Sequence, residues 1–504
     1  MIRAYPAADV LAAVATELAR GGAPDRLLRT AAAGVANIAA AELRRRTNRV
    51  YGCRVALLVG TGNNGADALL AGIALRRLGV TVDAVLTGDR ADEPGLQRLE
   101  GAGGRIHRTA IETAAIQAIV ATVDLIIDGI AGENSTPGLQ GRAAEIVTTL
   151  PQGVPVLAID LPSGIDPDSG ELPGLHVRAD VTVSCAEHKP GVLLPPAAHT
   201  AVGRLHFVRV GLPLMSTHPA VRRWGPDEIA TAWPVPDRAA HKYLRGVLGV
   251  VAGSDTYPGA AVLACMGAVE AAAGIIRFIG PPGVTNHVLT RVPESVPGIG
   301  QVQAWLLGSG VIDDPEQEVA IEHALASGQP CVVDAGALDS CVQRRFDGRR
   351  PTSSDAILLT PHAGELSRML DIIGAPAARD DVESRPLHYG RVLAQAIDVT
   401  VLVKGPTTLI IPPHGTVASQ AEAPPWLATA GAGDVLAGIA GALLSGGLSA
   451  LDAGEIAAHI HGRAAARVHR HRRNGPLTAS AVAAEVASTI GETLRSSYVG
   501  APSP

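Results

Sequence analysis

The sequence predicts an α/β protein with two domains in series, the first of which is built on a parallel sheet. The chain has 504 residues, more than one hydrophobic core usually serves. Apolar residues make up 47% of the chain but aromatic residues only 3%, so Ala, Val, Leu and Ile must form most of the cores, as is common in layered α/β proteins. Short apolar runs alternate with helical patterns, which is typical of βαβ units.

The strands of the first domain are predicted from six apolar runs that Gly, Pro or Asp residues bound. These runs are CRVALLVG at 53–60, TVDAVLTG at 81–88, VDLIIDGI at 123–130, VPVLAIDLPSG at 154–164, ADVTVSCAE at 179–187 and GRLHFVRVG at 203–211. The pattern then breaks from Leu212 to Lys242, where five prolines and the lack of a sustained period predict a linker with one short helix.

A second array of apolar runs follows the linker. Its predicted strands are GVLGVVAG at 246–253, GIIRFIG at 274–280, AWLLGSG at 304–310, CVVDAGAL at 331–338, AILLTPH at 356–362, VTVLVKGP at 399–406 and TTLIIPP at 407–413. We therefore expect a first domain over 1–213, a linker over 214–226, a second domain over 227–493 and a disordered tail over 494–504.

Composition argues against several classes of protein. A net charge of −6 gives no electrostatic reason to expect nucleic acid as a partner. Five cysteines without a C-x-x-C pair argue against zinc and for reduced thiols in a cytoplasmic protein. The longest apolar stretch, at 259–280, contains Glu270 and Arg277, so we expect a buried helix and strand there rather than a membrane span.

The stretch VGTGNNGADALLAGIALRRLG has the glycine spacing of a dinucleotide-binding turn. Gly60-x-Gly62-x-x-Gly65 follows an apolar run directly, although a tight turn without a ligand is the alternative explanation. Asp67 is expected in the first turn of the following helix, where its negative charge would not suit a diphosphate.

Polar residues follow several of the predicted strands at the point where each strand ends. The ligand crevice of an open parallel sheet lies at the carboxyl ends of its strands. In the first domain Asn63, Asn64, Asp128, Asp160 and Ser163 hold such positions. A helix N-cap is the alternative role for Asp128.

Four motifs together resemble the NAD(P)H-hydrate epimerase family: GNNGAD at 62–67, DGIAG at 128–132, DLPSGID at 160–166 and HKPG at 188–191. The resemblance covers about the first 210 residues. It implies a Rossmann-like domain in which the dinucleotide is a damaged substrate and not a redox cofactor. The resemblance also implies the residues that contact the hydrate, namely Asn63, Asn64, Gly65, Ala66, Asp67, Gly132, Glu133, Asn134, Ser135, Thr136, Pro137, Gly138 and Asp160.

A potassium ion and an acid/base are implied by the same resemblance. The ion would be held by Asn64, Asp128 and Ser163, and hard oxygen ligands suit such a cation better than zinc. Asp160 matches the acid/base that moves the proton at C6 of the hydrated ring, where a hydroxyl stands next to nitrogen. The family usually has GNNGGDG, so Ala66 and Ala68 add methyl groups near the expected ligand.

The strongest motif of the second domain is the glycine-rich stretch 431–434, which ends in Asp434 before a long apolar helix. Backbone N–H groups and the helix dipole would converge there on an anion such as phosphate. Helix capping by Asp434 is the alternative. Lys404 lies where a plain hairpin would also explain the sequence, and His362 and Glu365 lie where a helix start would.

Six motifs in register resemble the ribokinase-like superfamily and, within it, ADP- or ATP-dependent NAD(P)H-hydrate dehydratase. They are KYLRGVLGVVAGSDTYPGAAV at 242–262, PESV at 293–296, VVDAGAL at 332–338, LTPHAGE at 359–365, LVKGPTT at 402–408 and LATAGAGDVLAGI at 427–439. The match runs from about Asp227 to about Thr493. The family's glycine-proline-glycine turn is Gly308-Ser309-Gly310 here, and its DADAL is DAGAL at 334–338.

This second resemblance implies two sets of ligand contacts. The hydrate would contact Ala260, Gly310, His362 and Asp434, and the adenine nucleotide would contact Lys404, Gly405, Pro406, Thr407, Thr408 and Gly433. Asp434 would deprotonate the C6 hydroxyl, which then attacks the terminal phosphoryl group of ADP or ATP. Mg²⁺ and the amides of 431–433 would offset the developing charge before phosphate leaves.

The two resemblances imply a metabolite-repair enzyme that is an isomerase and a lyase in one chain. The first domain would interconvert the R and S epimers at C6, and the second would dehydrate the S epimer to NAD(P)H. The alternative is a kinase for a small vitamin alcohol, with a non-catalytic N-terminal binding module. The Ala/Arg-rich composition favours ADP, whereas the preference between NADH hydrate and NADPH hydrate is undefined.

The expected partners are the small-molecule substrates, without nucleic acid or membrane, and we expect a homo-oligomer of undefined size. Four histidines are clustered at 459–471: His459, His461, His469 and His471. We interpret this segment as the basic end of a helix, with a metal site as the alternative.

Overall fold

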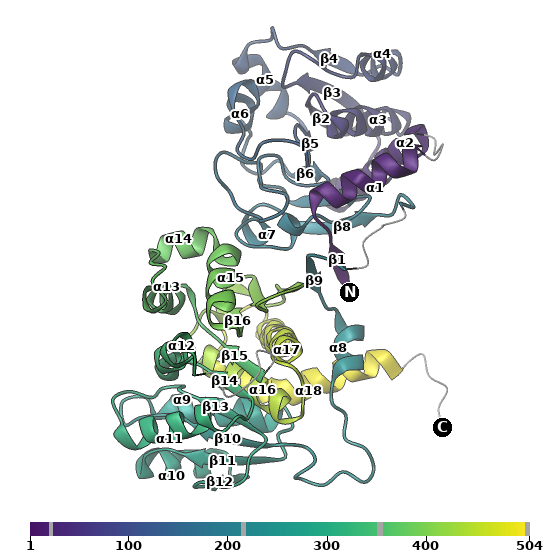
Figure 1. Cartoon of the computed structure of the whole chain (residues 1–504). Helices are drawn as coiled ribbons and strands as arrows, with labels where there is room; N and C mark the ends of the chain where they lie inside the picture. Colours follow the sequence, from purple (N-terminus) through teal and green to yellow (C-terminus); the bar gives the residue numbers. More distant parts are fainter. Residues whose placement is uncertain (20–23, 213–217, 350–355, 499–504) are drawn as a thin grey trace. The chain divides into compact units, whose positions relative to one another are not determined.

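The computed structural model of the chain describes residues 1–19, 24–212, 218–349 and 356–498 (Figure 1). It divides into two compact units, one from Arg3 to Val221 and one that contains Met1–Ile2 and the chain from Arg222 onward. No helix within the described ranges is both long and apolar enough to cross a bilayer. The five cysteines are buried free thiols.

Two of the expected boundaries need correction. Of the expected linker, 214–217 lie outside the described residues, and Val221–Arg223 form strand β9. Helix α8 (Pro226–Ala232) agrees with the short helix expected between Leu212 and Lys242. Of the expected disordered tail, 499–504 lie outside the described residues, and 494–498 continue α18 (Ala479–Tyr498). The helix extends because Leu494 still packs against the core of the C-terminal unit.

In the described part of the N-terminal unit, seven strands form one parallel sheet in the order β4-β3-β2-β5-β6-β7-β8. Their bounds are β2 (Arg54–Val59), β3 (Thr81–Leu86), β4 (Arg105–His107), β5 (Leu125–Gly129), β6 (Val156–Ile159), β7 (Val181–Cys185) and β8 (Arg204–Val208). The six expected strands are confirmed, and β4 is added at the edge.

Helices cover both faces of this sheet, which explains why its strands are continuously apolar. The bounds are α1 (Ala7–Ala19), α2 (Pro24–Thr47), α3 (Asn63–Arg77), α4 (Glu93–Gly101), α5 (Thr113–Val120), α6 (Gly141–Thr148) and α7 (Ala197–Thr200). Leu57 belongs to a core cluster with α2, α3 and α4, whereas Leu58 packs with α5 and α6. Alternate residues of one strand thus supply two cores.

The direction of strand addition reverses at β2. The chain adds β3 and β4 on one side of β2 and then returns to place β5 on the other side. In an open parallel sheet, such a reversal leaves a crevice outside the carboxyl ends of the two central strands. Asn63, Asn64 and Asp128 lie there, at the ends of β2 and β5.

Within the described residues, the strands of the C-terminal unit belong to an 11-stranded sheet in the order β1-β9-β18-β17-β16-β15-β14-β13-β10-β11-β12. Its further strands are β1 (Ile2–Ala4), β10 (Val247–Val251), β11 (Ile275–Ile279), β12 (Ser295–Pro297), β13 (Ala304–Leu307), β14 (Cys331–Val333), β15 (Ile357–Leu359), β16 (Thr400–Val403), β17 (Thr408–Ile411) and β18 (Val417–Gln420). Strands β10 to β16 pair in parallel, whereas β17 pairs with β16 and β18 antiparallel. The second sheet is therefore mixed, and its switch point lies between β10 and β13.

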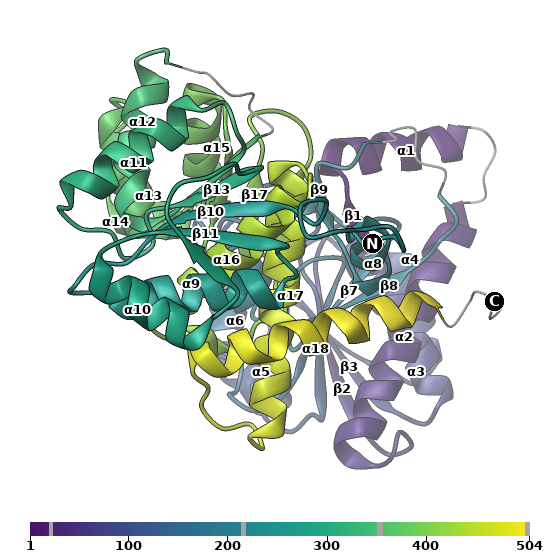
Figure 2. The same ribbon diagram turned by 90° about the horizontal axis from the view of Figure 1, so that it is seen from below.

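Two layers of helices enclose this sheet, and Figure 2 shows α11, α12 and α15 on the side of the strands opposite to α9 and α18. The remaining bounds are α9 (Pro258–Glu270), α10 (Pro282–Arg291), α11 (Pro315–Ala326), α12 (Leu338–Phe346), α13 (Ala363–Ile372), α14 (Arg379–Ser384), α15 (Pro386–Ile397), α16 (Ala432–Ser445) and α17 (Ala450–His471). The largest core cluster joins α9, α16, α17 and α18 to the central strands.

Helices α9 and α16 approach each other so closely that glycine is required on both. A Cβ at Gly438 would lie 2.1 Å from the carbonyl oxygen of Ala264, and a Cβ at Gly267 would lie 2.4 Å from that of Val435. Backbone atoms cannot yield as a side chain can, so this contact fixes where α16 begins.

We expect Gly438→Ala to destabilise the C-terminal unit by about 1–3 kcal/mol, the usual cost of overpacking a tight core. Gly491→Ala in α18 is the matched control, because no described atom lies within 4 Å of the added Cβ. Alanine favours a helix over glycine, so this control should be neutral or stabilising by up to about 1 kcal/mol. Thermal unfolding monitored by circular dichroism measures both, and a Gly438→Ala chain that melts at or above the wild-type temperature would contradict the packing argument.

Candidate active sites

Two glycines bring the ends of β2 and β5 into backbone contact. A Cβ at Gly60 would lie 1.7 Å from the carbonyl oxygen of Ile130, and a Cβ at Gly65 would lie 2.2 Å from that of Gly60. Because only glycine permits these approaches, the turn is tight and α3 begins at Asn63. The glycine spacing therefore brings this turn against the residue that follows β5. Asn64, the second residue of α3, then lies at the bottom of the crevice.

Asp128 lies inside β5 and is not a helix N-cap. The carboxylate is fully buried and accepts hydrogen bonds from the Ser163 hydroxyl at 2.6 Å, the Ser163 amide at 2.9 Å and the Ile130 amide at 3.2 Å. Burial raises its pKa to about 6 although these donors oppose the rise, so the group is mainly ionised at neutral pH. Among the described residues no ion pair involves Asp128, so a bound cation would compensate this buried charge.

The other two expected potassium ligands lie beside this carboxylate. The Asn64 amide donates to the carbonyl oxygens of Ala131 at 3.0 Å and Ile159 at 2.9 Å, and the Ser163 hydroxyl contacts the same Ala131 backbone. Asn64, Asp128 and Ser163 are thus brought together as an amide, a carboxylate and a hydroxyl. This oxygen-rich set and its uncompensated charge fit an alkali cation.

Asp160 follows β6 in a left-handed backbone conformation, with φ of 68°. Non-glycine residues adopt this conformation at some cost, and it occurs often at functional sites. The buried Asp160 Oδ1 accepts a hydrogen bond from Lys189 Nζ at 2.6 Å, and this Nζ also lies 3.2 Å from Glu133 Oε2. A buried lysine therefore joins the expected acid/base to a second carboxyl group.

The pKa values within this cluster diverge. Burial raises the pKa of Asp160 well above its usual value, and Glu133 adds to this rise while Lys189 opposes it. Burial also opposes ionisation of Glu133, but its hydrogen bond with Asp160 and the attraction of Lys189 lower its pKa to about 2. For Lys189 the two carboxyl groups outweigh burial and raise the pKa. Pairs of groups with divergent pKa values are typical of acid–base sites.

Asp67 differs from its expected state in two respects. Because α3 begins at Asn63, Asp67 lies in the second turn of the helix and not in the first. Burial, and next the charge of Glu133, raise its pKa to about 8, so it carries little negative charge at neutral pH. The expected conflict with a diphosphate is therefore removed by protonation.

The two alanines that depart from the family motif have different surroundings. Ala68 is fully buried in the core, and a Cβ at Gly129 would lie 2.8 Å from its methyl group. Its side chain therefore packs between α3 and β5 and not toward a ligand. Ala66 is partly exposed near the start of α3.

The loop 132–138, expected to contact the hydrate, passes beside the asparagine at the start of α3. A Cβ at Gly132 would lie 3.0 Å from the Asn64 side chain, so the loop backbone approaches it closely. Asn134, Ser135 and Thr136 are exposed on this loop, whereas Glu133 turns inward to Lys189. The loop thus presents polar groups at the edge of the crevice.

A second lysine, which is partly buried, organises the C-terminal unit. Lys404 Nζ, at the end of β16, lies 2.9 Å from Asp334 Oδ1 and 3.5 Å from Glu365 Oε2. Asp334 also accepts hydrogen bonds from the hydroxyls of Ser309 at 3.1 Å and Thr360 at 2.8 Å. Burial opposes ionisation of Asp334, yet Lys404 and these hydroxyls hold its pKa below the usual value.

Asp434 lies in the first turn of α16 and faces this ion cluster. The N-cap is Gly431, with φ of 85°, so capping by Asp434 is ruled out. Burial, and next the charge of Asp334, raise the pKa of Asp434 to about 7, whereas Lys404 and Ser309 oppose the rise. A carboxyl group with this pKa can accept a proton at neutral pH and return it.

Two of the expected hydrate contacts are adjacent, and the third caps a helix. A Cβ at Gly310 would lie 2.6 Å from the Cβ of Ala260, so the first turn of α9 and the loop after β13 meet there. His362 is the N-cap of α13, and its Nδ1 accepts a hydrogen bond from the Glu365 amide at 3.1 Å. The helix-start explanation for His362 and Glu365 is thus correct, and it leaves the His362 ring 57% exposed.

The expected nucleotide contacts form the turn of a hairpin. Strands β16 and β17 are antiparallel neighbours, and 404–407 connect them. Thr407 is buried, and within the described part of the chain its hydroxyl has no hydrogen-bond partner. A Cβ at Gly433 would lie 3.5 Å from Lys404 Nζ, so the hairpin and the start of α16 face each other.

Several charged partners of the expected site residues carry no functional role in the sequence-based predictions. Lys189 lies within the motif HKPG and Asp334 within VVDAGAL, without a predicted role, and Glu365 is predicted only to lie at a helix start. Each follows a predicted strand, which was the available signal. Their pairing with Asp160 and Lys404 joins loops far apart in the sequence, so spacing alone could not reveal it.

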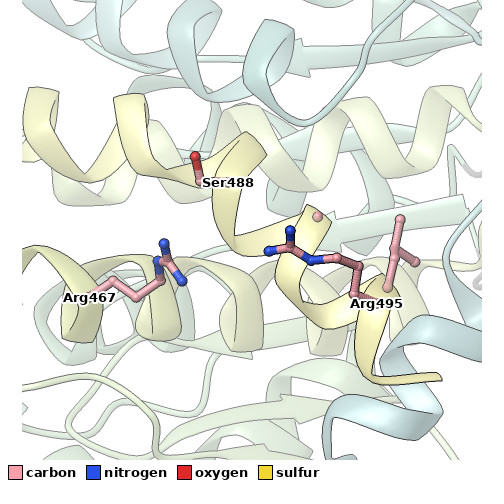
Figure 3. A pocket seen from close by; sticks show the side chains of 5 residues that line it. Arg467, Ser488 and Arg495 are labelled. Carbon is pink, nitrogen blue, oxygen red and sulfur yellow. The ribbon is translucent and has the colours of Figure 1, made fainter. Parts of the chain in front are cut away.

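Two other regions lie apart from these clusters. His459 and His461 are buried, and burial lowers their pKa values to about 4. His469 and His471 lie in the last turn of α17. Within the described residues, no cluster of His, Cys, Asp and Glu side chains could hold a metal ion. A pocket of about 600 Å³ is lined by Arg467, Ser488, Gly491, Leu494 and Arg495, and Figure 3 labels Arg467, Ser488 and Arg495. No expected site residue lines it, and Arg467 is paired with Glu485 and Glu492.

Known proteins resemble the chain in both halves. The family model described as NAD(P)H-hydrate dehydratase matches residues 248–486, and the model described as YjeF-related protein N-terminus matches residues 24–191. A solved structure, the ADP/ATP-dependent NAD(P)H-hydrate dehydratase of Bacillus subtilis co-crystallised with ATP/Mg²⁺, aligns with a TM-score of 0.49 and 24% identity, covering 54% of this chain and 99% of that one.

Curated relatives match over most of their length. The bifunctional NAD(P)H-hydrate repair enzyme Nnr of Mycobacterium tuberculosis is 38% identical over 451 residues, which cover 87% of this chain and 89% of the relative. The Corynebacterium glutamicum protein of the same name is 31% identical over 487 residues, with 83% of each chain covered. With its two units and two clusters of buried charge, the chain belongs to the family of bifunctional NAD(P)H-hydrate repair enzymes.

Proposed function

We propose that this chain repairs hydrated NAD(P)H at two separate sites. The N-terminal unit interconverts the R and S epimers at C6, and the C-terminal unit dehydrates the S epimer to NAD(P)H with ADP or ATP. Family membership over both units supports the pair of activities. The observation that carries the residue roles is the presence, at each crevice, of a carboxyl group with a raised pKa near a lysine, namely the buried Asp160 and the partly buried Asp434.

In the N-terminal unit, Asp160 moves the proton that epimerisation requires. Inversion at C6 needs a bond to that atom to break and re-form, and each event transfers a proton. The exposed residues of the loop 132–138, with Asn63 and Ala66, bind the hydrate. Asn64, Asp128 and Ser163 hold K⁺, which supplies a fixed positive charge next to the substrate.

In the C-terminal unit, Asp434 deprotonates the C6 hydroxyl for attack on the terminal phosphoryl group. The amides that follow Gly431 point toward the developing charge at the start of α16. Lys404 and the hairpin hold the nucleotide, while Ala260, Gly310 and His362 contact the hydrate. Mg²⁺ binds phosphates with water and one or two carboxylates, and Asp334 and Glu365 supply carboxylates beside Lys404 that fit such an ion.

Several finer features extend this proposal. ADP is the preferred nucleotide on the compositional argument above, and the protein works as a cytoplasmic homo-oligomer. Five buried free thiols support a reducing compartment.

We expect Asp434→Ala to reduce nucleotide-dependent dehydration by roughly 10²- to 10⁴-fold, the usual contribution of a positioned general base. Epimerisation should be unchanged, because Asp160 lies in the other unit. Both rates can be followed on hydrated NADH by chromatography of the two epimers and of NADH.

The matched control is Asp371→Ala, which removes an exposed carboxylate from the end of α13.

Wild-type kcat/KM for dehydration should rise as the pH passes upward through about 7, since only ionised Asp434 accepts the proton. Residual activity of Asp434→Ala should lack this limb. Dehydration at a near wild-type rate would remove Asp434 from the mechanism.

We expect Asp128→Asn to lower the rate of epimerisation and the dependence of this rate on potassium together, because the negative charge of one ligand of the ion disappears. A loss of potassium affinity of about tenfold to a hundredfold is the expected size. In the wild-type chain potassium should bind more weakly as the pH falls through about 6, where Asp128 takes up a proton. Rates at several potassium concentrations measure both effects.

Asp160→Asn is the comparison for this variant. It retains the shape of the side chain but cannot cycle a proton, so potassium binding should survive while interconversion of the epimers stops. An Asp128→Asn chain that is slower but needs the same potassium concentration as wild type would argue against this ion site.

A further inference from the structure

Glu133 and Asp160 form a carboxyl pair around one ammonium group. Lys189 Nζ lies 2.6 Å from Asp160 Oδ1 and 3.2 Å from Glu133 Oε2, so one ammonium group bridges the two carboxyl groups. If all three groups were ionised, a buried cluster would retain one uncompensated negative charge. One proton between the two carboxyl groups removes this charge and also their mutual repulsion.

The surroundings of the pair decide which carboxyl group takes the proton. The Asp160 side chain is 5% exposed and that of Glu133 is 17% exposed, so ionisation costs more at Asp160. Asp160 Oδ2 is buried and accepts no hydrogen bond from any described residue. A proton on Oδ2 would let Asp160 donate to Glu133 while its Oδ1 still accepts from Lys189.

We propose that Glu133 is a positioning residue for epimerisation, which holds the proton of Asp160 in a carboxyl–carboxylate hydrogen bond so that Asp160 begins the reaction as an acid. This inference rests on the proposed epimerase function. The other titratable groups around the pair do not act as bases, because Asp67 has a pKa of about 8 and burial raises the pKa of the Cys185 thiol well above its usual value.

The proton balance of the reaction closes on Asp160 alone. As the C6–N1 bond opens, N1 takes the proton of Asp160, and the Asp160 carboxylate then takes the proton of the C6 hydroxyl. C6 becomes an aldehyde, which rotates about the C5–C6 bond. When N1 attacks the opposite face of this aldehyde, both proton transfers reverse and Asp160 is protonated again.

The test is the pH profile of epimerisation by the full chain, wild type against Glu133→Gln, from about pH 5 to about pH 10. Glu133 raises the pKa of Asp160, so its replacement by an amide should move the alkaline limb of the profile to lower pH by about one unit or more. The rate on the alkaline side should fall about tenfold or more and recover as the pH is lowered.

Two further variants make the result specific. Glu133→Asp keeps a carboxylate, so its alkaline limb should stay near that of wild type even if the chain is slower. Glu145→Gln changes a side chain of α6 that is 60% exposed and should leave the profile unchanged. A Glu133→Gln profile of wild-type shape at any amplitude, or a Glu133→Asp limb displaced as far as that of Glu133→Gln, would overturn the inference.

Asp160→Asn separates this failure from failure of the proposed function. If it is inactive at every pH while Glu133→Gln has the wild-type profile, Asp160 remains the acid/base and only the role of Glu133 is wrong. If Asp160→Asn still interconverts the epimers, the proposed function of Asp160 is wrong and the inference about Glu133 is overturned with it.

Discussion

A lysine ammonium held between two carboxyl groups is the interaction on which each crevice depends. Lys189 joins Asp160 and Glu133 in one unit, and Lys404 joins Asp334 and Glu365 in the other. Burying any of these charges alone would be costly, so each loop is held where its partner can neutralise it. The same pairing ties together segments that follow different strands of one sheet. It thereby creates the unusual electrostatic setting of Asp160 and Asp434.

The backbone makes these pairings possible through close approaches that only glycine tolerates. Gly60 and Gly65 close the turn after β2 against the end of β5, and Gly438 lets α16 approach α9. The reversal of strand order in each sheet then leaves a crevice at the carboxyl ends of the central strands. Position in the sheet, rather than any single motif, explains why the proposed catalytic groups lie at this edge, Asp160 directly after β6 and Asp434 in the first turn of α16.

Much of this arrangement could be predicted from the sequence, because the relevant signals are local. Apolar runs between turn residues predicted the central strands, and the residue after each run indicated Asp128, Asp160 and Lys404. The short strands β4, β12 and β18 and the antiparallel pairing of β17 could not be predicted. Their pairing depends on which neighbouring strand remains free to pair, and runs of three or four residues carry no clear period.

Protonation states and long-range pairs were the least predictable part of the sites. Asp67 appeared as a negative charge near a helix start, yet burial beside Glu133 keeps it mostly neutral. Lys189 contacts Asp160 from 29 positions away along the chain, and Lys404 contacts Asp334 across 70. Such pairs depend on the order of strands in the sheet, which spacing in one sequence does not encode.

The central claim is that two separate sites act in series on one damaged cofactor. It is tested most directly by the end point of a reaction with a mixture of both epimers of hydrated NADH and excess nucleotide. The wild-type chain should convert both epimers to NADH, whereas Asp160→Asn should stop when the S epimer is exhausted and leave the R epimer to decline only at its spontaneous rate. Complete conversion by Asp160→Asn at the wild-type rate, or a wild-type reaction that leaves one epimer unused, would contradict the account.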